Sequence, residues 1–344
     1  MIIVLIAILL LTIVLPLLVK KVEENLEVFL LVMGIIAAVS SNALNFEELG
    51  RIFSNLNLYL ITAVVFVLGT AFMLLEKKID YVAGTMLEKM PLKLAVSLVI
   101  LLLGLLSSVI TAIIASMLLA EIVSMLPINR RQAIRVNIVA CFAIGLGAVL
   151  TPVGEPLSTI VISNLGEHFM YLFDMLAPYV IPAIVLLSVL GAFAVHDWHS
   201  DSSVSIEQVD PDKQTFKGVI ARTVKIFAFI VGLELLGAGF KPVIDQFVVV
   251  MSNFALYILN LLSAILDNAT LAAAEISPSM NALQIQTILM SLLISGGMLV
   301  TGNIPNIITA GRLKIRFKDW AKFALPVGAA LFIVYFVLSF VLHI

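Results

Sequence analysis

The chain has 344 residues, of which 62% are hydrophobic and only 12% are charged, and its mean hydropathy is +1.16. Soluble domains are about 45–50% apolar and about 25% charged, so this composition excludes a soluble globular enzyme, a disordered protein and a nucleic-acid-binding protein. Apolar runs of about 20 residues recur along the whole sequence, which indicates an all-α polytopic membrane protein. The one cysteine, Cys141, lies in an apolar run and is expected to be buried.

The first spans are oriented by the charges that flank them. An apolar run at residues 1–19 precedes a pair of lysines, whereas a cleavable signal peptide carries its positive charge before the apolar stretch. We therefore predict an N-terminal transmembrane helix within residues 1–25, with its N-terminus outside. Helices at about 26–44 and 58–75 follow, separated by the acidic loop NFEELGRIF.

Residues 92–126 are apolar throughout, yet the run is too long for one span. A helix of this length would reach roughly 50 Å, against a hydrocarbon core of about 30 Å. Basic residues flank both ends, so both ends belong on the cytoplasmic side. The run must therefore turn around, and its polar cluster, Ser107, Ser108 and Thr111, predicts the tip of a re-entrant helical hairpin.

The next segment, residues 132–164, is predicted to be a transmembrane helix broken at TPVGEPLS, because proline and glycine interrupt helical hydrogen bonding. A helix at about 176–195 then returns inward and completes a first repeat, residues 26–195. The longest polar run, residues 196–217, is predicted to be a cytoplasmic linker.

The second repeat, residues 218–344, follows the same plan in the opposite orientation. An outward helix leads to a second hairpin at 242–276, around the polar sequence LSAILDNAT, and then to a helix at 283–312 that is broken at TGNIPN. The basic residues that follow lie inside, and a final helix at about 324–344 leaves the C-terminus outside.

Sequence matches between the halves support two inverted-topology repeats. LLSSVIT in the first hairpin parallels LLSAILD in the second, and each hairpin precedes a helix broken at Thr, Gly and Pro residues. A broken helix leaves N–H and C=O groups unpaired at membrane depth, which is tolerated only where protein, ions or water satisfy them. Inverted repeats with broken helices are the architecture of secondary transporters, whose site lies where the repeats meet.

Asp267, in the second hairpin, is the strongest candidate for ion binding. An ionised acid at the centre of a membrane helix costs about 2.5–3.5 kcal/mol, so this carboxyl favours a bound proton or cation. Ser263, Asn268 and Thr270 add neutral oxygens of the kind that hard cations prefer. The alternative role for these residues is capping and packing of the hairpin arms.

The two breaks and the first tip complete the predicted cation/proton site. Glu155 is a candidate protonation site or cation ligand, with Thr151 beside it, and its alternative role is an N-terminal contact with the following half-helix. Asn303 and Asn306 lie in the second break. The first tip contributes Ser107, Ser108 and Thr111. The ligands of a transported sodium ion are expected to be Asp267, Asn268 and Glu155.

Other ionisable groups are expected away from this site. Glu121 and Glu275 lie near the return ends of the hairpins and are expected at an aqueous rim, and Glu234 at a surface or interface. The four histidines fall in loops or beside the C-terminus, so no metal site is predicted from them.

The motifs SAILDNAT, TPVGEPLS and GNIPNIITAGR resemble those of the ion transporter superfamily, from about residue 92 to residue 314. Within it the chain is most similar to NhaD-type sodium/proton antiporters and to an archaeal group of predicted cation transporters. The resemblance implies a scaffold domain, a mobile transport domain with elevator-like movement, and a dimer. The first hairpin departs from the pattern, because it has serine and threonine where a second acid or amide is expected.

The predicted function is that of a cation/proton antiporter of the plasma membrane, which exchanges sodium or lithium for protons without a cofactor. Its expected partners are membrane lipid, the transported ions and a second copy of the chain. The alternative is a sodium-coupled symporter of a small carboxylate or oxyanion, which half-helix N-termini are able to hold. An enzyme is not predicted, since no G-x-S-x-G motif and no histidine at membrane depth is found.

Overall fold

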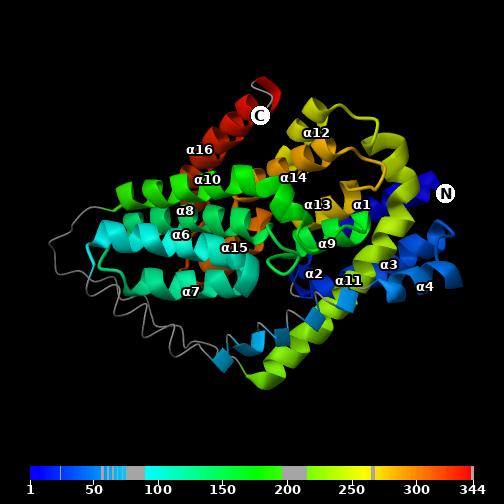
Figure 1. Cartoon of the computed structure of the whole chain (residues 1–344), viewed down its shortest axis with the longest axis horizontal. Coiled ribbons are helices and arrows are strands. Elements are labelled where there is room, and N and C mark those ends of the chain that lie inside the picture. The colour runs from blue at the N-terminus through cyan, green and yellow to red at the C-terminus, as the bar shows by residue number, and fades with distance from the viewer. Residues whose placement is uncertain are drawn as a thin grey trace.

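A computed structural model of the chain describes residues 1–23, 25–55, 58–59, 62–63, 66–67, 69–71, 73–74, 90–195, 215–264 and 268–341 (Figure 1). The elements of the first half are α1 (Ile2–Leu18), α2 (Lys20–Glu23), α3 (Leu26–Ser40), α4 (Phe46–Ser54), α6 (Leu92–Ile110), α7 (Ala112–Met125), α8 (Arg130–Ala148), α9 (Pro156–Leu165) and α10 (Tyr171–Phe193). Those of the second half are α11 (Phe216–Val243), η1 (Ile244–Val248), α12 (Asn253–Leu259), η2 (Asn260–Ala264), α13 (Asn268–Glu275), α14 (Ala282–Gly296), η3 (Val300–Gly302), α15 (Ile304–Arg312), α16 (Phe317–Phe336) and η4 (Val337–Val341).

The prediction of an all-helical membrane protein is confirmed for the described residues, which contain no strand. Three helical stretches in this part of the chain are long and apolar enough to cross a membrane, namely Leu92–Ile110, Tyr171–Phe193 and Phe317–Val341. The predicted span at 58–75 is described only in short pieces, and the predicted linker at 196–217 lies outside the described residues except for 215–217.

The long apolar run at 92–126 forms two helices that meet at Thr111, within the polar cluster from which a turn is predicted. Thr111 has a φ of +77°, a value that breaks the helix, and its hydroxyl accepts a hydrogen bond from the Ile114 N–H. The Ala112 N–H donates instead to the Gly154 carbonyl of the first break, over 2.7 Å. The first arm, α6, is 19 residues long, or about 28 Å, so it is nearly as long as the hydrocarbon core is thick.

Two helices in different halves begin with the same local device. α8 and α14 each start with a capping box, Asn129 with Gln132 and Asn281 with Gln284, in which side chains satisfy the first exposed N–H groups. Each of these helices is followed by a stretch that is not α-helical, with η3 inside the second one, and then by a short helix with proline in its first turn, α9 or α15. Proline fits there because the first helical N–H groups have no intrahelical partner.

The halves also pack on each other in a reciprocal way. The return arm of the first hairpin, α7, lies against α15 of the second half, and α13 lies against α9 of the first half. Within the first half α6, α8 and α10 form one packed group. In Figure 1 this group lies on the left of the molecule and α9 and α13 lie to its right.

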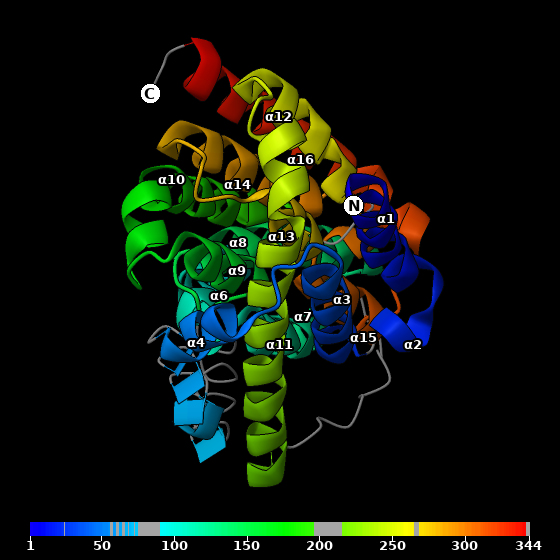
Figure 2. The same cartoon turned by 90° about the vertical axis from the view of Figure 1, so that its right-hand side faces the viewer.

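A second group of helices is built around α11, which runs along one side of the molecule with α3 beside it (Figure 2). Their backbones approach closely at two glycines: a Cβ on Gly34 would lie 2.3 Å from the Gly232 carbonyl oxygen. α1 packs on both α3 and α11, while α9 and α13 join this group to the rest of the chain.

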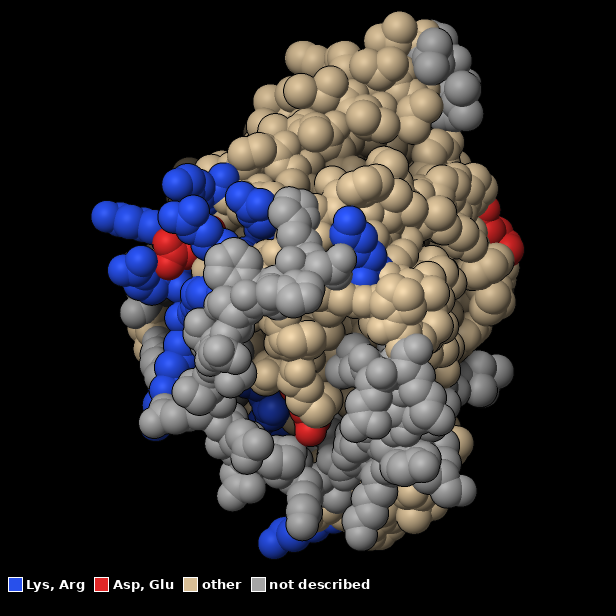
Figure 3. Space-filling model, turned by 90° about the vertical axis from the view of Figure 1, so that its left-hand side faces the viewer, with Lys and Arg blue, Asp and Glu red and all other residues tan. Residues whose placement is uncertain are grey.

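Basic residues of both halves gather at one end of the molecule. Figure 3 shows a cluster of Lys and Arg on this face. Arg130, at the start of α8, donates hydrogen bonds to the Leu313 and Lys314 carbonyls, and Arg316 pairs with Asp319 nearby. The segments predicted to be cytoplasmic at 130–135 and 312–318 therefore lie side by side.

The contact between α6 and α8 predicts a sharp sensitivity to side-chain size. A Cβ on Gly147 would lie 1.8 Å from the Gly104 carbonyl oxygen, which is backbone and cannot move aside alone. We expect Gly147→Ala to lower the free energy of unfolding by about 1–3 kcal/mol through overpacking, measured as a loss of thermal stability in detergent. Gly50→Ala is the control, since nothing lies within 4 Å of that position. Equal melting temperatures for the two variants would contradict the packing described.

Candidate functional site

The first hairpin tip is tied to the first break by side-chain hydrogen bonds. The Ser107 hydroxyl donates to the Ile144 carbonyl over 3.0 Å, and the Thr151 hydroxyl donates to the Ser108 carbonyl. Ser107, Ser108 and Thr111 are buried, and Thr151 is half-buried. These hydroxyls donate to backbone carbonyls, while their lone pairs remain able to accept a hydrogen bond or bind a cation.

The second tip is tied to the second break in the same manner. The buried Ser263 hydroxyl donates to the Leu292 carbonyl over 3.2 Å. Gly302 lies directly on the hairpin, since a Cβ there would be 2.5 Å from the Ser263 carbonyl oxygen and 3.0 Å from that of Ala264. Glycine is therefore required at this approach, and carbonyl oxygens of the hairpin face the break.

Asn303 and Asn306 supply amide oxygens that have no donor. Both side chains are buried, at 2% and 0% exposure. The Asn306 Nδ2 group donates to the Gly296 and Leu299 carbonyls, at 2.9 and 2.8 Å, and so holds the break in shape. The Oδ1 atoms of Asn303 and Asn306 have no hydrogen-bond partner. Buried acceptors without a donor are costly unless a ligand or water satisfies them, and a cation is such a ligand.

The two tip-and-break pairs meet at α8. A Cβ on Gly145 would lie 2.5 Å from Asn303 Nδ2, and Gly145 directly follows Ile144, whose carbonyl accepts from Ser107. The second break therefore lies against the turn of α8 that carries the first hairpin. Phe142, one turn earlier, packs on Gly297 in the same break.

Glu155 is buried, at 4% exposure, and is the N-cap residue of α9. Its side chain makes no capping hydrogen bond to that helix. Its location at the N-terminus of a half-helix still gives it a favourable interaction with the helix dipole.

The second hairpin turn is described only in part. Asp267 lies outside the described residues, and so does the side chain of Thr270, although Thr270 itself belongs to α13. Asn268, the first residue of α13, is 2% exposed and its Nδ2 atom has no hydrogen-bond partner.

Asn137 is a polar residue of this region that sequence reasoning missed. It is fully buried on α8, where its Nδ2 group donates to the Thr309 hydroxyl of α15 at 3.0 Å, and its Oδ1 atom has no partner. Cys141 contacts the same hydroxyl and is buried as expected. The available signal was an amide within an apolar helix, where each polar group needs a partner.

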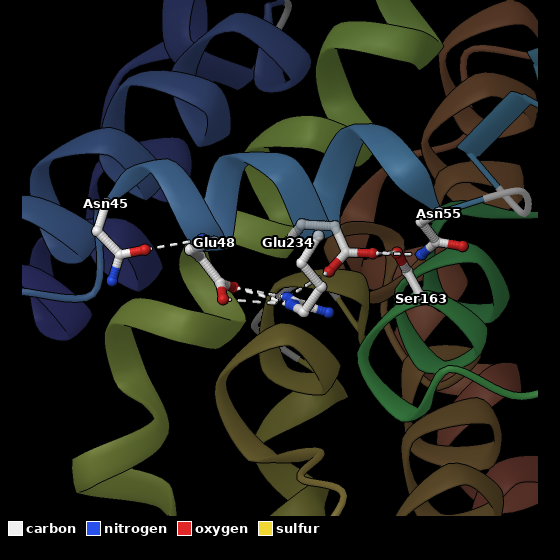
Figure 4. Close-up of polar contacts among 6 residues, drawn as sticks. Asn45, Glu48, Asn55, Ser163 and Glu234 are labelled. Atoms are coloured by element: carbon white, nitrogen blue, oxygen red, sulfur yellow. Dashed lines mark hydrogen bonds and ion pairs between the residues drawn. The ribbon is translucent and has the colours of Figure 1, made fainter.

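Two acids are not where the sequence placed them. Glu275 is 5% exposed, so the expectation of an aqueous rim is wrong. Glu234 is 2% exposed and accepts from Arg51 at 3.1 Å, from Asn55 at 2.8 Å and from the Ser163 hydroxyl (Figure 4). Glu48 and Glu234 raise the pKa of Arg51 above its usual value, chiefly through the Glu48 hydrogen bond. This cluster could not be predicted from the sequence, because its members come from α4, α9 and α11, which are far apart in the chain.

The oxygens at the two breaks that are able to coordinate an ion belong to carboxyl, amide, hydroxyl and carbonyl groups, a set that suits a hard cation. In the described part of the chain there is no group of three or more His, Cys, Asp or Glu residues that could hold a metal ion. Of the histidines, His168 is exposed, as expected, and the other three lie outside the described residues.

A family model described as "Protein of unknown function (DUF1646)" matches residues 2–342 of the chain. None of the curated proteins compared with the chain matches it.

Of the two asparagines in the second break, Asn306 is expected to contribute more than Asn303 to the stability of the folded protein. Asn306→Ala removes both hydrogen bonds that the Asn306 amide donates, which should lower the free energy of unfolding by about 1–3 kcal/mol. Asn303→Ala, the matched control, removes a buried amide of the same loop whose oxygen has no partner. Thermal unfolding in detergent tests this, and a variant pair of equal stability would contradict the assigned role of Asn306.

Proposed function

The chain belongs to the DUF1646 family, and we propose that it is a secondary active transporter, a cation/proton antiporter that exchanges sodium or lithium for protons. The observation that carries the proposal is the set of buried acceptor oxygens without donors at the second break, next to the first hairpin through Gly145. A cation bound there satisfies what the protein leaves unsatisfied.

The coupling follows from the cost of a bare charge in lipid. Asp267 and Glu155 are the acids of the proposed site, with Asn268 as a further ligand of the transported ion. Either a proton or a cation neutralises the carboxyl of Asp267, and a carrier that changes conformation only when neutralised exchanges one ion for the other. Neutral oxygens of Asn303 and Ser263 then complete the cation's coordination, as hard cations require. No cofactor and no enzymatic step is needed.

The architecture that we propose is a pair of inverted repeats, each with a re-entrant hairpin and a broken helix. Three observations support it: the paired capping boxes of α8 and α14, the tie of each tip to the break of its own half, and the reciprocal packing of α7 on α15 and α13 on α9. A two-fold relation between halves generates such reciprocity. The helices around α11 are the proposed scaffold, and the molecule is a proposed homodimer with elevator-like movement.

The proposed location is the plasma membrane, with both chain termini outside. The gathering of Arg130, Arg316 and their neighbours at one end supports this orientation, since basic residues concentrate on the cytoplasmic side.

Antiport is testable in proteoliposomes loaded with a pH-sensitive dye. Addition of sodium or lithium should release internal protons through the protein, and Asp267→Asn should abolish the signal because its side chain no longer takes up a proton. Asp174→Asn is the matched control, since that aspartate is 67% exposed at its side chain. Cation-driven proton flux that survives Asp267→Asn, or that requires an added carboxylate or oxyanion, would contradict the proposal, and the second result would identify the symporter alternative.

Asn303 is expected to affect affinity more than folding. Loss of one neutral ligand should raise the sodium concentration for half-maximal proton release by about tenfold, equivalent to ~1.4 kcal/mol. The control is Asn253→Ala, a half-buried asparagine at the start of α12. An unchanged concentration dependence in Asn303→Ala would remove this residue from the cation site.

A further inference from the structure

A buried carboxyl and a buried amide face each other across the arms of the second hairpin. Asn260 begins η2 in the first arm and Glu275 ends α13 in the second, and they are 0% and 5% exposed. The Asn260 amide lies beside the Glu275 carboxyl. η2 and α13 pack on each other, which brings these two positions together.

The Asn260 amide is able to bond to the Glu275 carboxyl in either protonation state. Glu275 Oε2, Asn260 Oδ1 and Asn260 Nδ2 are all buried, and none of them has a hydrogen-bond partner. An ionised carboxylate accepts from the Nδ2 group, whereas a neutral carboxyl donates to Oδ1. A bare buried charge is costly, so a carboxyl in this position favours uptake of a proton, and the amide is able to follow the change.

No neighbouring cation takes the place of that proton. The elements packed on α13 are α1, α9, α11, α14, η1 and η2. Their charged residues, with the N-cap of α9 included, are Glu155, Lys217, Arg222, Lys225, Glu234, Lys241 and Asp245. Lys241 is ion-paired with Asp245, Glu234 is paired with Arg51, and the other three basic residues lie near the N-terminal end of α11. None of the ion pairs between described residues includes Glu275.

A route for protons begins at the residue after Glu275. Ile276, Ser277 and Pro278 line a pocket of about 330 Å³, whose other walls include Glu234 and Lys241. A space of this size and polarity admits water. The pair is also distinct from Asn268, since α13 has eight residues and is about 12 Å long, too far for one ion to contact Asn268 and Glu275 together.

We propose that Glu275, together with Asn260, is a second proton-binding site, which passes protons between this pocket and the N-terminal end of α13. The proposal rests on the antiport function proposed above. The carboxylate accepts a proton from water in the pocket, the neutral carboxyl donates a hydrogen bond to Asn260 Oδ1, and the proton is later released towards Asn268. The net charge of the hairpin thus alternates without movement of a metal ion through this position.

Two transport modes separate a role in proton transfer from a role in cation binding or folding. Exchange of labelled sodium for unlabelled sodium needs no proton, whereas sodium/proton antiport does. We expect Glu275→Gln to lose antiport and keep sodium/sodium exchange, while Asp174→Asn keeps both. Loss of both modes in Glu275→Gln would assign the residue to cation binding or folding and overturn the proposal. Retention of both modes at the rates of the unmodified protein would overturn it equally.

A spectroscopic measurement tests the site even if the protein proves not to be an antiporter. In infrared difference spectra of the purified protein after a pH change, we expect a C=O stretching band from a protonated carboxyl that Glu275→Gln removes. Asn260→Leu should shift the band, because it removes the hydrogen-bond acceptor. If Glu275→Gln leaves the spectrum unchanged, Glu275 does not exchange protons and the proposal fails. If the unmodified protein shows no antiport, the proposed function fails, and the band alone decides whether Glu275 binds a proton.

Discussion

The rest of this structure depends on one constraint: the backbone polar groups that an interrupted helix leaves unpaired need hydrogen-bond partners. Each break exposes N–H and C=O groups that an apolar surrounding cannot satisfy, so other groups of the chain must bond to them. The Ala112 N–H of the first hairpin donates to the Gly154 carbonyl of the first break, and Asn306 Nδ2 donates to the Gly296 and Leu299 carbonyls at the second. Ser107 and Ser263 also hold each hairpin to the helix that precedes the break.

Within two of the buried amides, the nitrogen and the oxygen have different roles. Asn306 uses its nitrogen to hold the second break, and Asn137 uses its nitrogen to hold α15 against α8, while both oxygens have no partner. An amide in such a position is a fixed dipole with its negative end presented to the interior. Buried dipoles of this kind favour a positive charge at the position that they face, which is the physical basis of the function proposed here.

Sequence reasoning could locate the breaks and the turn, because each is written in local chemistry. Ser and Thr within an apolar run mark the turn at Thr111, and proline with glycine marks the stretches after α8 and α14. It could not foresee the burial of Glu275, which depends on the register of two arms, or that of Glu234, whose partner Arg51 is far away in the chain. Contacts between distant segments have no local signal. Asn137 differs, because an amide within an apolar helix is itself a local signal, although its partner Thr309 is far away in the chain.

The Glu234 cluster joins helices that belong to different parts of the bundle. Its Ser163 hydroxyl comes from α9, beyond the first break, whereas Arg51 and Asn55 come from α4 and its C-terminal end. Any sliding of α9 past α11 must therefore strip a buried carboxylate of one donor, at a cost of about 1–3 kcal/mol. Such a contact stabilises the arrangement described here over one in which α9 has shifted along α11. The population ratio that it contributes is a factor of roughly ten to one hundred.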